Sequence, residues 1–122
     1  MQATPFRFGP LALTNTLTTN ILNPGTTTGG VNSGSGSNLR IVLTHIRIVN
    51  KTAGAVTFSL YLGATGANAA GTEVIGTAYS VAANVAFDWY GRLKMDPADF
   101  LVGGASAATS LTIQGEGEIT IV

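Results

Sequence analysis

The chain has 122 residues, of which only 10% are charged, and its six basic and six acidic residues give a formal net charge of zero. Ordinary soluble domains carry about 25% charged residues, and a protein needs clustered Lys and Arg to release counterions from a nucleic acid. The composition therefore argues against nucleic acid or an anionic membrane as a partner. It favours a subunit whose surface is covered by other copies or by another protein, with a small charge-poor monomer as the alternative.

The length suits a single domain that buries about two-thirds of its unfolded surface. The sequence contains no cysteine, which excludes disulfides and thiolate metal sites. The first residues lack the basic segment and apolar core of a signal peptide. Because no apolar run approaches the roughly 18 residues that a bilayer span requires, we expect no membrane segment.

Residues 1–38 have the composition of an arm and a connector. Residues 11–22 are rich in Thr and β-prone, whereas residues 23–38 are mostly Gly, Ser, Thr and Asn and behave as a flexible linker. We therefore divide the chain into an N-terminal arm with its connector, residues 1–38, and a β-sandwich domain, residues 39–122. An ordinary first strand followed by a long loop is the alternative. The apolar side chains that such an arm offers to a partner are Leu11, Leu13, Leu17 and Ile21.

Residues 39–50 and 55–63 predict an antiparallel hairpin with a Gly-containing loop. Strict alternation places Ile46 and Ile48 on one face of the first strand and Ile41, Leu43 and His45 on the other. Apolar residues on both faces indicate a central strand, or a strand whose outer face meets a partner.

Alternation continues to the end of the chain, and no stretch has the 3.6-residue apolar period of a helix. Gly115 and Gly117 in the last strand suggest a bulge or the close approach of another backbone. The predicted strands lie near residues 5–9, 11–22, 39–50, 55–63, 72–79, 84–92, 93–96, 99–102 and 110–122. Short strands at this spacing predict an all-β fold, a single antiparallel β-sandwich of jelly-roll type with an extended N-terminal arm.

Polar residues with catalytic potential are few. His45 is the only histidine, and in the middle of a strand it is better explained as a packed or surface residue than as a catalytic one. Glu116 and Glu118 lie two residues apart on one face, which suits a solvated face, a guard against edge pairing, or a salt bridge to an arginine. We predict no catalytic residue, no metal ligand and no cofactor.

The aromatic residues Phe87, Trp89 and Tyr90 lie close together in one predicted strand. We expect Phe87 and Trp89 in the core, and Tyr90 on the surface near Tyr61 or Tyr79. Exposed tyrosines anchor protein interfaces and can also stack on sugars. We therefore predict Tyr61 and Tyr90 as partner-binding residues.

Residues 39–122 resemble small β-sandwich virion proteins of tailed bacteriophages, among them capsid decoration and head accessory proteins. The resemblance rests on HIRIVNKTAGAVTFSLYLGATGANAAGTEVIG and on SVAANVAFDWYGRLKMDPADFLVGGASAATSLTIQGEGEI. The shared layout is a hairpin, a Gly/Ala loop, an Asp-containing turn and a final alternating strand.

This resemblance implies a non-enzymatic homo-oligomer, most often a trimer, that assembles in the host cytoplasm and binds the major capsid protein or another virion protein. A capsid decoration protein that stabilises the assembled head is the leading expectation. A head-to-tail connector, a tail subunit, or a receptor- or carbohydrate-binding module on a fibre or baseplate are the alternatives.

Overall fold

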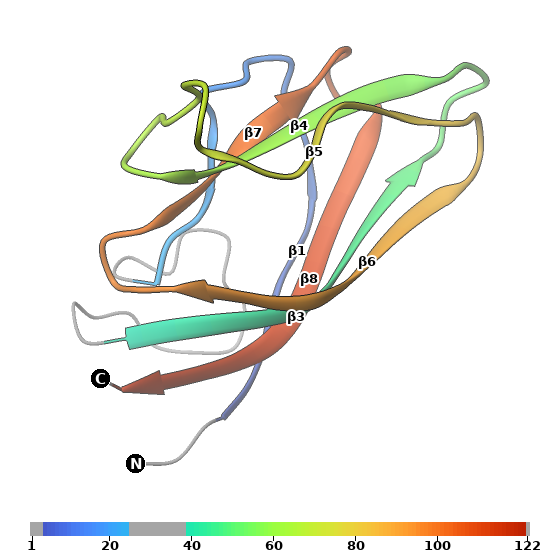
Figure 1. Ribbon diagram of the computed structural model, residues 1–122. Helices are drawn as coiled ribbons and strands as arrows, with labels where there is room; N and C mark the ends of the chain where they lie inside the picture. The colour runs from blue at the N-terminus through green and yellow to red at the C-terminus, as the bar shows by residue number, and fades with distance from the viewer. Residues whose placement is uncertain (1–3, 25–38, 122) are drawn as a thin grey trace.

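The computed structural model describes residues 4–24 and 39–121, the last of these by its backbone only (Figure 1). The described residues form eight strands and no helix, and therefore none that could cross a membrane. The strands are β1 (Thr4–Ala12), β2 (Asn20–Leu22), β3 (Leu39–Asn50), β4 (Val56–Gly63), β5 (Glu73–Val81), β6 (Ala86–Met95), β7 (Phe100–Ala105) and β8 (Leu111–Ile121).

The strands form two four-stranded antiparallel sheets that pack face to face (Figure 1). The first sheet has the order β1-β8-β3-β6 and the second has the order β2-β7-β4-β5, so successive strands alternate between the sheets for most of the chain. Eight strands in two sheets linked by such crossovers make a jelly roll. The predicted all-β sandwich is confirmed.

The core lies between the two sheets and is made of aliphatic and aromatic side chains from both. Among the largest fully buried side chains are Phe8, Ile46, Phe58, Leu60 and Met95. Every strand contributes at least one buried residue, as alternation predicts for two sheets that each turn one face inward.

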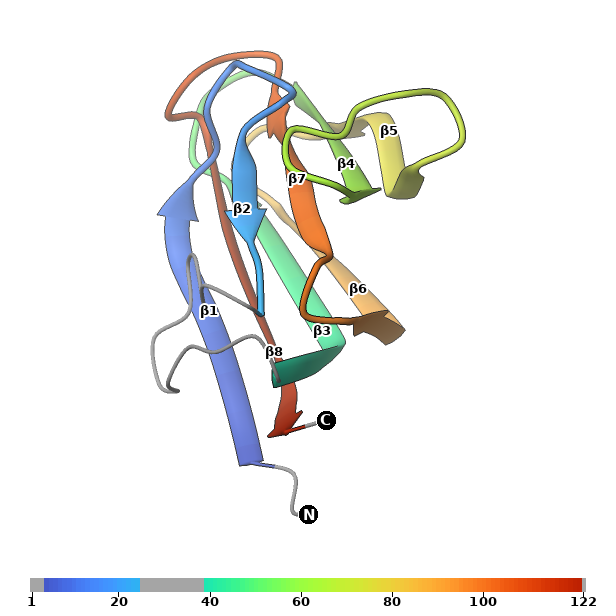
Figure 2. The ribbon, with the colours of Figure 1, turned by 90° about the vertical axis from the view of Figure 1, so that its left-hand side faces the viewer.

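The structure corrects the expected arm. Residues 4–12 form β1, which pairs with β8 from Thr4↔Ile119 to Ala12↔Thr112, and β2 pairs with β7 (Figure 2). Phe6 and Phe8 are buried in the common core. The alternative, an ordinary first strand, describes this segment better, because its alternating apolar residues complete both sheets. The expected linker lies mainly in residues 25–38, outside the described residues.

A β-bulge corrects the predicted faces of β3. The pairing of β3 with β8 shifts between Leu43 and His45, so Thr44 is an extra residue relative to β8. Ile41 and Leu43 point into the core before the bulge, and Ile46 and Ile48 do so after it. The bulge therefore puts four residues on one face that strict alternation had divided between two, and it leaves His45 on the outer face.

The β3–β6 pairing shifts at the same place but in the opposite sense. Leu43 pairs with Leu93 and His45 pairs with Tyr90, so Gly91 and Arg92 of β6 both lie opposite Thr44. The first sheet is thus irregular across three neighbouring strands at this level, where bulges increase the local twist.

The close approach expected in the last strand is real. A Cβ atom at Gly117 would collide with the backbone carbonyl of Val42 on the neighbouring strand. This contact lies beside the bulge, where β3 and β8 shift register. Gly117 therefore allows β8 to follow the distorted β3 at this point.

Candidate functional site

The two sheets differ in the number of charged residues that their strands carry. All charged residues of the chain lie within the described residues, and the strands of the first sheet hold eight of them, whereas those of the second sheet hold Glu73. The charged residues of the first sheet are Arg7, Arg40, Arg47, Asp88, Arg92, Lys94, Glu116 and Glu118. A polar site is therefore expected on the outer face of the first sheet.

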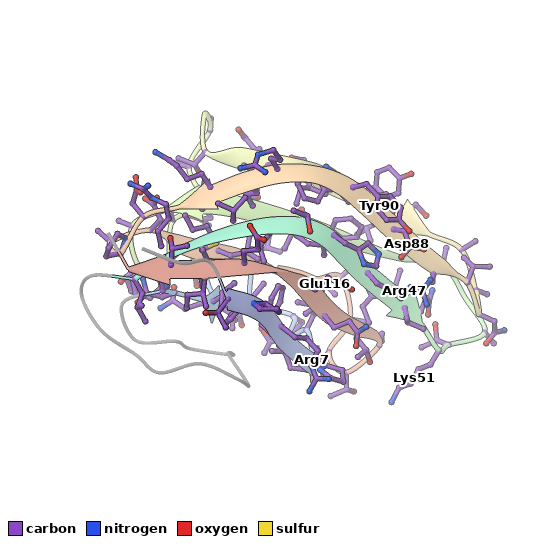
Figure 3. All side chains as sticks on the ribbon, turned by 90° about the horizontal axis from the view of Figure 1, so that it is seen from below. Arg7, Arg47, Lys51, Asp88, Tyr90 and Glu116 are labelled. Atoms are coloured by element: carbon purple, nitrogen blue, oxygen red, sulfur yellow. The ribbon has the colours of Figure 1, made fainter. Side chains whose placement is uncertain are left out.

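Four side chains from three adjacent strands form a polar cluster on that face. His45 Nε2 lies 2.8 Å from Asp88 Oδ1, and His45 Nδ1 lies 3.4 Å from Glu116 Oε1. Arg47 Nε and Nη2 donate to the two oxygens of Asp88 at 2.8 and 3.2 Å. Figure 3 shows Arg47, Asp88 and Glu116 on one face of the sheet, with Arg7 on the neighbouring β1. Antiparallel pairing of β3 with β6 and β8 produces the cluster.

Asp88 is the centre of this cluster. Its hydrogen bonds, first from Arg47 and then from His45, lower its pKa from 3.8 to about 2. Hydrogen bonds and positive charges of this kind favour the carboxylate over the acid. Asp88 is therefore ionised at any physiological pH and orients the side chains of Arg47 and His45.

The geometry of His45 differs from that of a hydrolase. In a catalytic triad one ring nitrogen faces a carboxylate and the other faces the nucleophile, whereas here both nitrogens face carboxylate oxygens. Both nitrogens donate hydrogen bonds only when the ring is protonated. Within the described part of the chain, no group of three or more His, Asp or Glu side chains is arranged to hold a metal ion. The cluster therefore has the character of an ion-pair network.

The expectation for Glu116 and Glu118 needs one correction. Neither residue guards a sheet edge, because β8 lies between β1 and β3 once the N-terminal segment joins the sheet. Glu116 lies opposite Arg7 in the β1–β8 register and close to His45, so it belongs to the ion-pair network. The salt-bridge interpretation is the better one for this residue, with His45 as the partner in place of the predicted arginine.

The predicted tyrosine pair does not exist. Tyr61 is 7% exposed and belongs to the second sheet, so it offers little surface to a partner. Tyr90 is 71% exposed and stacks on His45, with ring centroids 4.6 Å apart and an angle of 10° between the planes. Tyr79 packs instead against Phe58 and Phe87. Of the two predicted tyrosines, only Tyr90 is available to bind a partner.

The apolar residues assigned to the arm also differ in burial. Leu13 and Ile21 are buried in the core and Leu11 is partly buried, so their role in this conformation is to hold the sandwich together. Leu17 is 38% exposed, in the loop that joins the first two strands. Leu17 is therefore the member of this set that remains open to a partner.

Leu17 lines a groove on the outer face of the second sheet. The groove has a volume of about 310 Å³, and none of its lining residues is charged. They are Asn15, Leu17, Thr57, Phe58, Ser59, Ala78, Gly104, Ala105 and Ser106. A Cβ at Gly104 would lie 2.8 Å from the carbonyl oxygen of Thr14, so the missing side chain allows the loop to lie close against β7.

The two serine hydroxyls of the groove already have partners within the chain. Ser59 Oγ accepts a hydrogen bond from the amide of Ala78 at 2.8 Å, and Ser106 Oγ accepts one from the amide of Thr57 at 3.1 Å. The loop is held by the amide of Ala105, which donates to the carbonyl oxygen of Thr14 at 2.8 Å. The groove thus presents a neutral surface whose serine hydroxyls are already hydrogen-bonded, which suits contact with an uncharged partner.

Sequence reasoning identified neither the groove nor the ion-pair network. Asp88 lies 43 positions from His45, and the groove combines residues from the first loop with residues of three later strands. Opposite charges on the outer positions of adjacent strands are the signal that could have identified the network, but strand order is needed to use it. Comparisons of this chain with protein-family models, curated proteins and solved structures give no significant match.

Proposed function

We propose that this protein is a non-enzymatic structural subunit of a tailed-phage virion, and that it acts as a capsid decoration protein. The single observation that carries the proposal is the nearly uncharged second sheet, whose strands hold one of the twelve charged residues of the chain. A surface with little charge and few unmet hydrogen bonds loses little when it is covered, because few polar groups must be desolvated.

The fold supports this proposal as an analogy. Jelly rolls recur in viral capsid and lectin domains, although a fold alone does not define a function. The resemblance of residues 39–122 to small virion proteins points in the same direction. The proposed partner is the major capsid protein or another virion protein, bound by a homo-oligomer of this chain in the virion.

The mechanism is stabilisation by selective binding. A protein that binds the assembled lattice and not the free subunits stabilises the assembled state by mass action. We place the contact on the groove around Leu17, with Thr57 and Ser106 on its walls. Deletion of residues 1–22 would not test this contact, because it removes β1 and β2 from the sandwich.

The test uses the particle with which the chain co-purifies. Mass spectrometry and negative-stain images give its copy number and position, and purified chain is then added back to particles that lack it. We expect the added chain to raise the temperature at which the particles open. Leu17→Asp should reduce occupancy at least tenfold, whereas Val49→Asp, at a position 36% exposed on the first sheet, should not. Particles that neither bind nor gain stability would contradict the proposal.

Tyr90 favours one second candidate, a receptor- or carbohydrate-binding module. One face of its ring covers His45, while the side chain remains 71% exposed on the strand that also carries Asp88. An open aromatic face next to charged hydrogen-bonding groups suits the stacking of a sugar ring. A glycan-array hit that is lost in Tyr90→Ala and kept in Leu17→Asp would place this candidate first. A connector or tail subunit shares the fold and would be identified by its position in the particle.

A further inference from the structure

The four edge strands of the two sheets are not equally protected against pairing. β2 has only three residues, and β5 is broken by positive φ angles at Ile75 and Ala78. β1 contains Pro10, which has no amide hydrogen, within a register shift between Phe8 and Leu11. Short strands, prolines, irregular backbone and charged side chains are the usual means by which native sheets prevent edge-to-edge association.

The remaining edge strand, β6, has the least protection in its backbone, and its protection lies in the charged side chains Asp88, Arg92 and Lys94. It runs for ten residues, contains no proline and has no residue with positive φ, and its one irregularity is the register shift against β3 at Gly91 and Arg92. Its inward side chains Phe87, Trp89 and Leu93 stay partly exposed, although the β3 residues opposite them are fully buried. The core is therefore incompletely covered along this edge.

The outward residues of β6 are self-complementary. Asp88 and Arg92 lie two residues before and two residues after Tyr90. When a strand pairs antiparallel with a copy of itself about Tyr90, each Asp88 lies opposite Arg92 of the other copy. Opposite charges at directly paired positions stabilise a sheet, and like charges destabilise it.

We propose that β6 pairs with β6 of a second copy of this chain about a two-fold axis through Tyr90. The two first sheets then join into one continuous sheet of eight strands, with the same patch on both subunits as a two-fold contact requires. In this register Phe87 lies opposite Leu93, which brings together two of the inward side chains that one copy leaves partly exposed.

This inference goes beyond the virion role, because it concerns contact between copies and holds whatever the dimer binds. It also differs from the trimer that the resemblance implies. The dimer and the virion role can therefore fail independently of each other.

The first test is the mass of the purified full-length chain by sedimentation equilibrium. We expect a dimer, and Arg92→Glu should raise its dissociation constant at least tenfold, because each copy then places a carboxylate at position 92 opposite Asp88. Lys94→Glu is the matched control, since Lys94 faces Ala86 in this register and its reversal should change the constant less than threefold. A wild-type monomer or trimer, or equal effects of both variants, would overturn the proposal.

The second test places a cysteine on the axis. The chain has no cysteine of its own, and directly opposite residues of an antiparallel pair have Cα atoms about 4.5–5.5 Å apart, within the range of about 4.4–6.8 Å that a disulfide needs. Oxidised Tyr90→Cys should run mainly as a covalent dimer on a non-reducing gel, and Lys51→Cys should not. Equal cross-linking of the two folded variants would refute the two-fold axis at Tyr90.

Discussion

The outer faces of the two sheets have the same strand geometry but differ in charge. The first sheet concentrates charge, and Arg47, Asp88 and Glu116 join His45 in a network centred on Asp88. Arg40 and Lys94 pair separately with Asp96. The second sheet has almost no charge, and the hydroxyls of Ser59 and Ser106 beside its groove accept hydrogen bonds from backbone amides. The low charge of the chain is thus a property of one face more than of the whole surface, and that neutral face is the one we expect a partner to cover.

The largest expected effect tests whether the N-terminal segment belongs to the first sheet as firmly as the other strands do. Phe8 is fully buried in β1, so Phe8→Ala should lower the free energy of unfolding by about 3–5 kcal/mol. Urea denaturation of the purified chain measures this. A loss below about 1 kcal/mol would show that β1 is only loosely attached, as the arm hypothesis implies.

The next effect tests the second sheet. A Cβ at Gly104 would lie 2.7 Å from the carbonyl oxygen of Thr16, in the loop that lies over β7. We expect Gly104→Ala to cost about 1–3 kcal/mol, the usual range for overpacking, because the loop backbone must move. Leu17→Ala in the same loop serves as the control in the same denaturation series. An unchanged midpoint for Gly104→Ala would mean that the loop does not rest on the sheet.

A smaller effect is the pH dependence of stability, which we expect to differ between the two sheets. The folded pKa of Asp88, about 2, lies below its ordinary value of 3.8. The carboxylate therefore adds stability that is present above about pH 4 and is lost as the pH falls toward 2. We expect Asp88→Asn to flatten the fall in melting temperature over this interval.

The comparison for Asp88 is Glu73→Gln on the second sheet. The pKa of Glu73 is also lowered, by hydrogen bonds from its own backbone amide and from that of Gly71, but no cation takes part. If the melting temperature of Asp88→Asn falls with pH as steeply as that of the wild type, Asp88 does not contribute to stability through the network.

The smallest effect concerns Leu17. Its side chain is 38% exposed, so Leu17→Ala should change the free energy of unfolding by no more than about 0.5 kcal/mol. Thermal denaturation followed by circular dichroism is sufficient to measure this. A stable fold combined with weaker binding to particles would support a contact role, while a loss above about 2 kcal/mol would assign Leu17 to the core instead.

Strand positions were predictable from sequence because alternation is local. The predicted strand at residues 39–50 coincides with β3, and the predicted strand at 110–122 corresponds to β8, Leu111–Ile121. The predicted strands at 84–92 and 93–96 are one strand, β6. The register shift at Gly91 interrupts its pairing with β3 without ending the strand.

Burial of the N-terminal residues was not predictable in the same way. The Thr-rich segment around Leu13 has the same local pattern whether it lies in its own sandwich or on a neighbour. The choice depends on β7 and β8, which lie at the other end of the chain and provide the edges that accept β2 and β1. For the same reason the burial of Tyr61 was not predictable. Alternation places Tyr61 on the outer face of its strand, yet its side chain is buried in the structure.

The sequence alone therefore determined the fold class, the absence of thiol chemistry and the shortage of charge, because these follow from composition and from a two-residue period. Tertiary structure alone decided which sheet carries the charge, that Tyr61 is buried, and that His45 meets Asp88 and Glu116. These features depend on strand order, and the outward position of His45 depends also on the register shift at Thr44. A single inserted residue in one strand changes which side chains face outward, and only the pairing of distant strands shows where that insertion lies.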